Sequence, residues 1–215
     1  MKYELAIFDM DGTILDSLND LYVSVNYALK EAGMPARTFD EVRQFVGNGV
    51  TKLIQRSVPA GTSAEDTEKV FNIFSDHYIV HCSDTTKPYD GIPEILTWLR
   101  ENDVKTAVVS NKADPAVQEL YKQYFDGQFD IAVGERPGIR KKPAPDAVIT
   151  ILNKLGVDKS KAVYIGDSDV DVNTAKNAEM DCIAVAWGFR SVEFLKENGA
   201  ETIVYNADEL AALLK

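Results

Sequence analysis

The sequence predicts an α/β fold in which a doubly wound parallel sheet carries an inserted α-helical domain. From residue 88 onward, short apolar runs alternate with amphipathic segments, which is typical of a parallel sheet with helices on both faces. An earlier apolar run, residues 3–8, is separated from the others by a stretch that shows only helical periodicity. We therefore expect a core of residues 1–15 and 84–215 and a cap of residues 16–83.

Composition and charge narrow the class of protein. The chain has 215 residues, of which 45% are hydrophobic and 27% charged, as in an ordinary globular protein that buries one core. A net charge of −11 disfavours binding to nucleic acid. We find no signal peptide, no apolar run of the ~18 residues that a membrane span needs, and no zinc pattern around Cys82 and Cys182. We expect a cytoplasmic monomer or homodimer that acts on a small molecule.

The inserted stretch has four segments with helical spacing of apolar residues. Ser17 is placed to cap the first helix, and Gly33 follows its end. Gly47-Asn48-Gly49 separates the second helix from the third. We expect these helices at residues 18–32, 39–46, 50–57 and 64–82, and no strand between residues 14 and 84.

The remaining segments alternate between strand and helix. Gly156 and Gly199 end two of the helices, and Pro115 favours the start of another. We expect strands at residues 3–8, 105–110, 129–134, 162–166, 182–186 and 202–205. We expect helices at residues 92–102, from 114, and at 145–155, 169–178, 191–198 and 207–214.

Polar side chains follow several of these strands directly. Asp9 and Asp11 come after the first strand, and Ser110 ends the strand that begins at residue 105. Because ligands of open α/β sheets bind beyond the carboxyl ends of the strands, we expect these groups to meet in one crevice. The alternative for Asp9 and Asp11 is an Asp-Gly turn without function. Asp167 and Asp171, after the strand at residues 162–166, favour the crevice.

A crevice with several carboxylates needs a cation, because like charges repel. Oxygen ligands without histidine or cysteine favour Mg²⁺ over zinc. Such a site, together with a lysine and a hydroxyl group, can neutralise a phosphoryl group. An aspartate can attack phosphorus, and a second carboxyl group two residues later can move protons.

These residues resemble the four ordered motifs of the haloacid-dehalogenase-like hydrolase superfamily. The motifs correspond to Asp9-Met10-Asp11-Gly12-Thr13, Ser110, Lys142 and Gly166-Asp167-Ser168-Asp169-Val170-Asp171, and they cover essentially the whole chain. The resemblance implies a Rossmann-like core with a helical cap inserted after the first motif. It also implies that Asp9 is the nucleophile and Asp11 the general acid/base.

The same resemblance implies the remaining ligands. Mg²⁺ is expected at Asp9, the backbone carbonyl of Asp11 and Asp167, with support from Asp171. The candidate residues for binding the phosphoryl group are Ser110, Asn111, Lys142, Gly12 and Thr13.

Four candidate residues have simpler alternatives. Lys142 lies in a basic run that could be a solvated loop, but the Pro143-Ala144-Pro145 that follows is similar to the family pattern and selects it over Lys141. Asp169 is more simply a helix cap than a ligand. His77 and His81 have the spacing of metal ligands, but without a third ligand they indicate a helix surface.

The cap and two core segments are similar to phosphoglycolate phosphatases. The similarity lies in Val46-Gly47-Asn48-Gly49, with Leu53 and Arg56 beyond, in Arg136-Pro137-Gly138 and in Trp187-Gly188-Phe189-Arg190. The cap candidates for contact with the substrate are Asn48, Gly49, Lys52 and Arg56. The alternative for these residues is an Asn-Gly turn between helices, with exposed basic side chains.

The function expected from the resemblance is a Mg²⁺-dependent phosphomonoester hydrolase that uses an aspartyl-phosphate intermediate on a small phosphorylated metabolite. Four alternatives remain. Three are enzymes: a phosphomutase similar to β-phosphoglucomutase, a pyrophosphatase and a nucleotidase. The fourth is a phosphate-binding module without activity, because a fold alone never proves activity.

Overall fold

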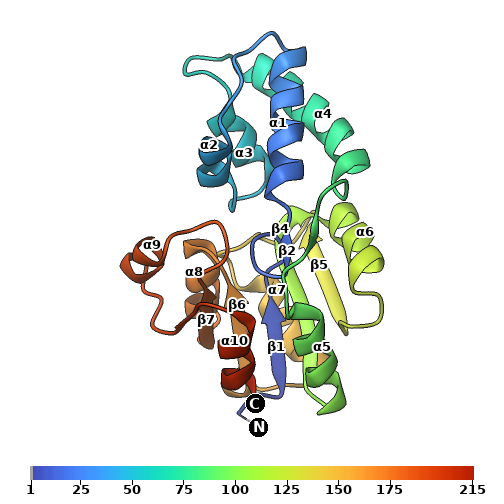
Figure 1. Ribbon diagram of the computed structural model, residues 1–215, viewed down its shortest axis with the longest axis vertical. Helices are drawn as coiled ribbons and strands as arrows, with labels where there is room; N and C mark the ends of the chain where they lie inside the picture. Colours follow the sequence, from blue (N-terminus) through green and yellow to red (C-terminus); the bar gives the residue numbers. More distant parts are fainter. Residues whose placement is uncertain (1) are drawn as a thin grey trace.

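A computed structural model describes residues 2–215, and its centre is a parallel sheet of six strands (Figure 1). The strand order is β5-β4-β1-β6-β7-β8, and every neighbouring pair is parallel. The strands are β1 (Leu5–Phe8), β4 (Lys105–Ala113), β5 (Ile131–Glu135), β6 (Ala162–Gly166), β7 (Asp181–Val185) and β8 (Ile203–Val204). The predicted α/β class with a doubly wound parallel sheet is therefore confirmed.

Helices cover both faces of this sheet. Side chains of β1 alternate between two hydrophobic clusters: Ala6 and Phe8 face one cluster, and Leu5 and Ile7 face the other. The first cluster contains residues of α5 (Ile92–Glu101), α6 (Asp114–Tyr124) and α10 (Ala207–Leu214). The second contains residues of α7 (Asp146–Leu155) and α8 (Asp169–Asn177). Burial on both faces explains why β1 is a continuous apolar run.

Four helices form a separate layer beyond the carboxyl ends of the strands (Figure 1). We call this layer the helical lobe. It consists of α1 (Leu18–Glu31), α2 (Phe39–Phe45), α3 (Val50–Ser57) and α4 (Ala64–His81). Helices α1 and α4 pack along each other, and the ring of Tyr27 on α1 stacks on that of His77 on α4.

Two connections join the helical lobe to the sheet. They pair as a short antiparallel ribbon of β2 (Leu15–Asp16) and β3 (Lys87–Pro88). The sequence did not predict this ribbon, because strands of two residues are too short to show a period. Within residues 2–215, no helix combines the length and the apolar character needed to cross a membrane.

Smaller differences from the prediction occur at element ends. Strand β4 continues past Ser110 to Ala113, and a short 3₁₀ helix, η1 (Lys159–Lys161), precedes β6. The predicted cap function of Ser17 is wrong. Ser17 lies at the start of α1, but its side chain makes no capping bond and donates instead to Asp11. Helix α9 (Val192–Glu197) packs near α8.

Candidate active site

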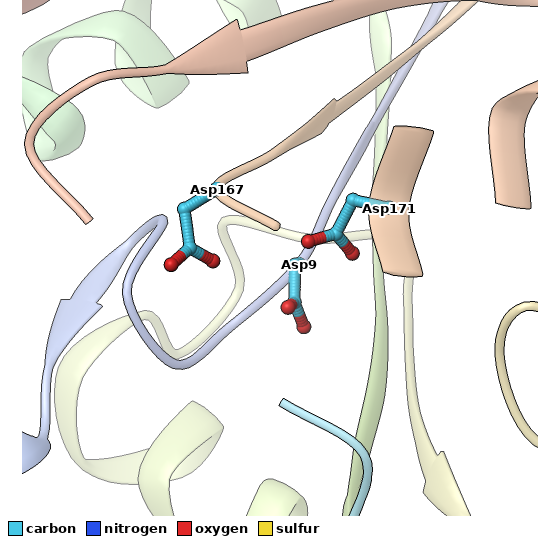
Figure 2. A group of neighbouring side chains, drawn as sticks. All are labelled: Asp9, Asp167 and Asp171. Carbon is cyan, nitrogen blue, oxygen red and sulfur yellow. The ribbon is translucent and has the colours of Figure 1, made fainter. Parts of the chain in front are cut away.

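The acidic residues of the site come from neighbouring strands. Strand β1 lies between β4 and β6, so the loops after these three strands meet at one edge of the sheet. Figure 2 shows Asp9 after β1, Asp167 after β6 and Asp171 on α8, with their carboxylates turned towards a shared space. Each contributes one oxygen atom to a group in which all three atoms lie within 4.8 Å of one another.

Lys142 joins two of these carboxylates. Its Nζ lies 2.8 Å from Asp9 Oδ1 and 2.8 Å from Asp171 Oδ1, and its side chain is 2% exposed. Burial lowers the pKa of Lys142, but Asp171 and Asp9 outweigh that effect and raise the pKa well above its usual value. The ammonium group therefore stays charged and neutralises part of the acidic cluster.

Asn111 fixes the loop that carries Lys142. Its Oδ1 accepts from the Lys142 backbone N–H at 2.9 Å, and its Nδ2 donates to the Lys142 carbonyl at 3.1 Å. The same Nδ2 donates to the carbonyl of Gly47 in the helical lobe at 3.4 Å. The amide group is thus engaged with backbone, and its structural contribution is to orient Lys142.

Asp171 is fully buried and has partners on both oxygen atoms. Oδ1 pairs with Lys142, and Oδ2 accepts from the backbone N–H of Ser168 at 3.1 Å and from its hydroxyl at 2.6 Å. These bonds fix the first turn of α8. Asp171 is therefore placed to hold Lys142 beside Asp9.

Asp167 lies at the centre of a tight backbone cradle. The N–H of Phe189 donates to its Oδ2 at 2.7 Å, and the Thr13 hydroxyl donates to its Oδ1 at 3.3 Å. A Cβ atom on Gly12 would come within 2.5 Å of Asp167 Oδ2, and one on Gly188 within 2.2 Å of its Cβ. Gly12 also has φ +84°, a conformation that favours glycine. Gly12 and Thr13 therefore contact Asp167 directly.

The charge balance of this cluster favours a bound cation. Burial raises the pKa of Asp9 well above its usual value; Lys142 opposes that rise, whereas Asp171 and Asp167 add to it. Burial and the Asp171 carboxylate raise the pKa of Asp167 to about 7. The donor set consists of carboxylate oxygens only, which suits a hard divalent ion such as Mg²⁺.

Asp11 faces a second lysine, Lys112. Its Nζ lies 2.9 Å from Asp11 Oδ1 and 3.2 Å from Oδ2, and it also donates to the hydroxyl of Tyr78 on α4. The hydroxyl of Ser17 donates to Asp11 Oδ1 at 2.6 Å. Burial lowers the pKa of Lys112, but Asp11 and Tyr78 outweigh burial and raise it above the usual value.

Sequence reasoning missed both Lys112 and Tyr78. A signal for Lys112 was present, because it follows Ser110 by two positions on β4, and side chains two apart share a face of a strand. Tyr78 had no such signal. Its place on the apolar face of α4 indicated only a core residue, and it does stack on Phe74, with ring centroids 5.2 Å apart.

A cavity of about 50 Å³ lies between the helical lobe and the edge of the sheet. Asp9, Asp11, Ser110 and Asp167 line it from the sheet side. The lobe contributes mainly apolar side chains, namely Leu21, Val46, Val50 and Leu53. The cavity therefore has a polar floor and a largely apolar roof.

Only one of the four candidates from the lobe lines this cavity. Gly49 does so, at the start of α3. Asn48 and Arg56 bond to each other at 2.8 Å and border a separate groove. Lys52 is exposed. These three side chains lie outside the enclosed space.

The other sequence candidates also have defined places. Asp169 is the first residue of α8 and lies 3.9 Å from Arg190, outside the cavity. Lys141 lies 3.5 Å from Glu135. The rings of His77 and His81 stack on each other on α4, with centroids 4.3 Å apart.

The fold and this site define an α/β protein with an acidic centre at the carboxyl edge of a parallel sheet. The sequence profile of the haloacid dehalogenase-like hydrolases matches residues 6–185, and the chain belongs to this family. The resemblance stated from the motifs is thereby confirmed.

Several proteins within this family are similar to the chain over most of its length. A phosphoglycolate phosphatase of Pseudomonas putida is 32% identical, over 98% of this chain and 78% of that protein. A phosphoglycolate phosphatase of Aquifex aeolicus is 34% identical, over 86% of this chain and 85% of its own length. The crystal structure of a candidate phosphoglycolate phosphatase from Lactobacillus delbrueckii subsp. bulgaricus has a TM-score of 0.95 and 42% identity. It covers 100% of this chain and 99% of the other.

Proposed function

We propose that this hydrolase removes phosphate from a small phosphomonoester through an aspartyl-phosphate intermediate on Asp9. Membership of the family and the phosphatases among the relatives support a phosphatase that acts on small phosphorylated metabolites. The observation that carries the proposal is that only one of the two Asp9 carboxylate oxygens is bonded. Its Oδ1 is held by Lys142 and by the N–H of Met10, at 2.8 and 2.7 Å, while Oδ2 has no bond to the described residues, and Asp9 lines the cavity.

The free oxygen of Asp9 attacks phosphorus, and the bond from phosphorus to the ester oxygen breaks. Asp11, two residues later and in the lining of the same cavity, gives a proton to the departing oxygen. In the second half of the reaction Asp11 takes a proton from water, which attacks phosphorus and releases phosphate and free Asp9. Lys142 and Ser110 bind the phosphoryl oxygens, and Asn111 keeps Lys142 in place.

Asp9, Asp167 and the backbone carbonyl of Asp11 would hold Mg²⁺, and Asp171 would support the site through Lys142. When bound, Mg²⁺ offsets the negative charge of the carboxylates and of the phosphoryl group. Gly12 and Thr13 act on Asp167, whose orientation they fix.

The helical lobe acts as a cap domain, residues 16–83, over the core of residues 1–15 and 84–215. Its apolar roof excludes water from the cavity when the two parts are in contact. About 50 Å³ of space is the liquid volume of about two water molecules, which is less than a whole phosphate ester occupies. The closed cavity therefore favours a small leaving group over a sugar or a nucleoside.

Phosphoglycolate is the substrate that fits these observations. The two curated relatives described above are phosphoglycolate phosphatases, and the leaving group of phosphoglycolate has only two carbons. We also place the protein in the cytoplasm, where the two free cysteines, Cys82 and Cys182, would stay reduced.

Phosphate release with Mg²⁺ tests the proposal across phosphoglycolate, a sugar phosphate, a nucleotide and pyrophosphate. Phosphoglycolate should be hydrolysed best, and a chelator should stop the reaction. Asp9→Asn should lower kcat about a thousandfold or more while the circular dichroism spectrum stays unchanged. Near wild-type turnover by Asp9→Asn would refute the nucleophile. Isomer formation without net release of phosphate would favour a phosphomutase.

A further inference from the structure

The proposed mechanism gives one buried cation no contact with the substrate. Lys112 has a side chain that is only 3% exposed, and it lines the cavity beside Asp11. A buried lysine is costly to keep unless its charge is used or paired, and Lys112 is paired with Asp11. Lys142 serves Asp9 and the phosphoryl group, whereas Lys112 contacts the general acid/base.

We propose that Lys112 and Tyr78 bind a carboxylate on the leaving group, so that this enzyme prefers phosphorylated hydroxy acids to neutral phosphate esters of the same size. The inference rests on the proposed phosphatase function and names the substrate class of that site. Lys112 supplies the positive charge, and Tyr78 supplies a second hydrogen bond from the helical lobe.

Lys112 lies on the side of the cavity where the leaving group departs. It contacts Asp11, which gives its proton to the leaving oxygen, whereas Lys142 contacts Asp9, which attacks from the other side of phosphorus. An incoming carboxylate at this place would share the ammonium group with Asp11. Ser110 and Lys112 both line the cavity, and the backbone N–H of Lys112 donates to the Ser110 hydroxyl at 3.3 Å.

Tyr78 completes the arrangement with a free donor. Its hydroxyl oxygen accepts a hydrogen bond from Lys112, and among residues 2–215 no acceptor is recorded for its own proton. The Tyr78 side chain lines the cavity, so this proton is available to an anion there. An ammonium and a hydroxyl side by side can bind the two oxygens of one carboxylate.

Asp11 has a second partner besides Lys112. The hydroxyl of Ser17 donates to Asp11 Oδ1 at 2.6 Å without adding charge. This bond would keep Asp11 in place while the Lys112 ammonium, which is paired with Asp11, also contacts an anion that enters the cavity.

The other two cations near the cavity are held away from the side where the leaving group departs. Arg190 lines the cavity, but it donates to the carbonyls of Arg43 and Val46 in the helical lobe. Lys142 is held between Asp9 and Asp171. The apolar roof formed by Leu21 and its neighbours offers no partner for a carboxylate.

Two substrates of the same size test the proposal. 2-Phosphoglycolate and 2-hydroxyethyl phosphate both have leaving groups of two carbons, but only the first has a carboxylate. The readout is the ratio of kcat/KM for phosphoglycolate to kcat/KM for 2-hydroxyethyl phosphate, measured with Mg²⁺. The wild-type ratio should be well above one.

Lys112→Met should lower this ratio about ten- to hundredfold, the value of a hydrogen bond to a charged group. Tyr78→Phe should lower it less, because it removes one oxygen and leaves the ring stacked on Phe74. Lys122→Met, an exposed lysine on α6, is the matched control and should leave the ratio unchanged. In the Asp9→Asn background, calorimetry should show that Lys112→Met weakens phosphoglycolate binding most, that Tyr78→Phe weakens it less, and that Lys122→Met leaves it unchanged.

The outcomes separate this inference from the proposed function. A wild-type ratio near one, with Asp9→Asn inactive, would overturn the carboxylate proposal and leave the phosphatase. Equal losses of kcat/KM on both substrates in Lys112→Met and Tyr78→Phe would also overturn it and restrict both residues to orienting Asp11. Absence of phosphate release from every ester would overturn both proposals.

Discussion

Arg43 and Arg190 each donate to backbone carbonyls next to the other arginine, across the boundary between the helical lobe and the sheet. Arg43, on α2, donates to the carbonyls of Phe189 and Gly188 at 3.2 and 3.0 Å. Arg190 donates to the carbonyl of Arg43 at 3.0 Å and to that of Val46. The two guanidinium groups therefore tie the lobe to the loop that supplies the Phe189 N–H to Asp167.

We expect Arg43→Met to weaken the proposed metal site from a distance. Without the guanidinium, the loop at Gly188 and Phe189 loses its anchor, and the N–H bond to Asp167 becomes less well ordered. The Mg²⁺ concentration for half-maximal activity should rise several-fold, with a smaller change in kcat. Arg100→Met, an exposed arginine on α5, is the control. An unchanged Mg²⁺ requirement in Arg43→Met would contradict an effect of Arg43 on the metal site.

Lys142→Met should both stop turnover and destabilise the fold. It leaves Asp9 and Asp171 as buried carboxylates without their shared cation, and removing one partner of a buried ion pair costs about 3 kcal/mol or more. Urea unfolding at pH 7 measures this loss. Lys141→Met is a matched neighbour whose ion pair with Glu135 is partly exposed, and it should cost less than about 1 kcal/mol. Equal costs in the two variants would disprove the buried pairing.

The acidic cluster should make stability depend on pH when no divalent ion is bound. The pKa of Asp167 is raised to about 7 and that of Asp9 is also raised, so the folded state binds these protons more tightly than the unfolded state. That contribution is complete below about pH 4, where unfolded aspartate titrates. It is lost as the pH rises through about 7. In a chelator, the thermal midpoint should therefore fall between pH 5.5 and 8.

Mg²⁺ should reverse this fall, because it replaces protons as the partner of the carboxylates. The gain in thermal midpoint on adding Mg²⁺ should be larger at pH 8 than at pH 5.5. Asp167→Asn should reduce both the pH dependence and the gain. If Mg²⁺ raised the midpoint equally at both pH values and in Asp167→Asn, the proposed site would be wrong.

Asp20 should stabilise the segment that leads from α4 to β3, one of the two connections between the helical lobe and the sheet. Its carboxylate accepts from the backbone N–H and the hydroxyl of both Thr85 and Thr86. Burial raises the pKa of Asp20, but these bonds outweigh it and lower the pKa below the usual value. Asp20→Ala should lower the free energy of unfolding at pH 7 by about 1–3 kcal/mol. Asp76→Ala, an exposed change on α4, should have almost no effect.

Much of the fold could be predicted because its signals are local. The run from Leu5 to Phe8 is apolar at every position, as a strand buried on both faces must be, and Gly156 ends α7 in a left-handed conformation. The two-residue ribbon of β2 and β3 could not be predicted, because its stability comes from pairing between the two connections. The cap function expected of Ser17 was wrong for a similar reason, since the partner of its hydroxyl, Asp11, lies before the helix.

The sequence by itself determined which chemical groups follow the strands. Asp9, Asp11 and Asp167 each follow the end of a strand and Ser110 lies in the last half of β4, and parallel pairing brings such ends together whatever the details of packing. Only the tertiary structure decided the partners of these groups. Lys112 meets Tyr78 across 34 positions, and Arg43 meets Phe189 across 146. Such contacts depend on how the helical lobe packs against the sheet, and no periodicity in the chain encodes that packing.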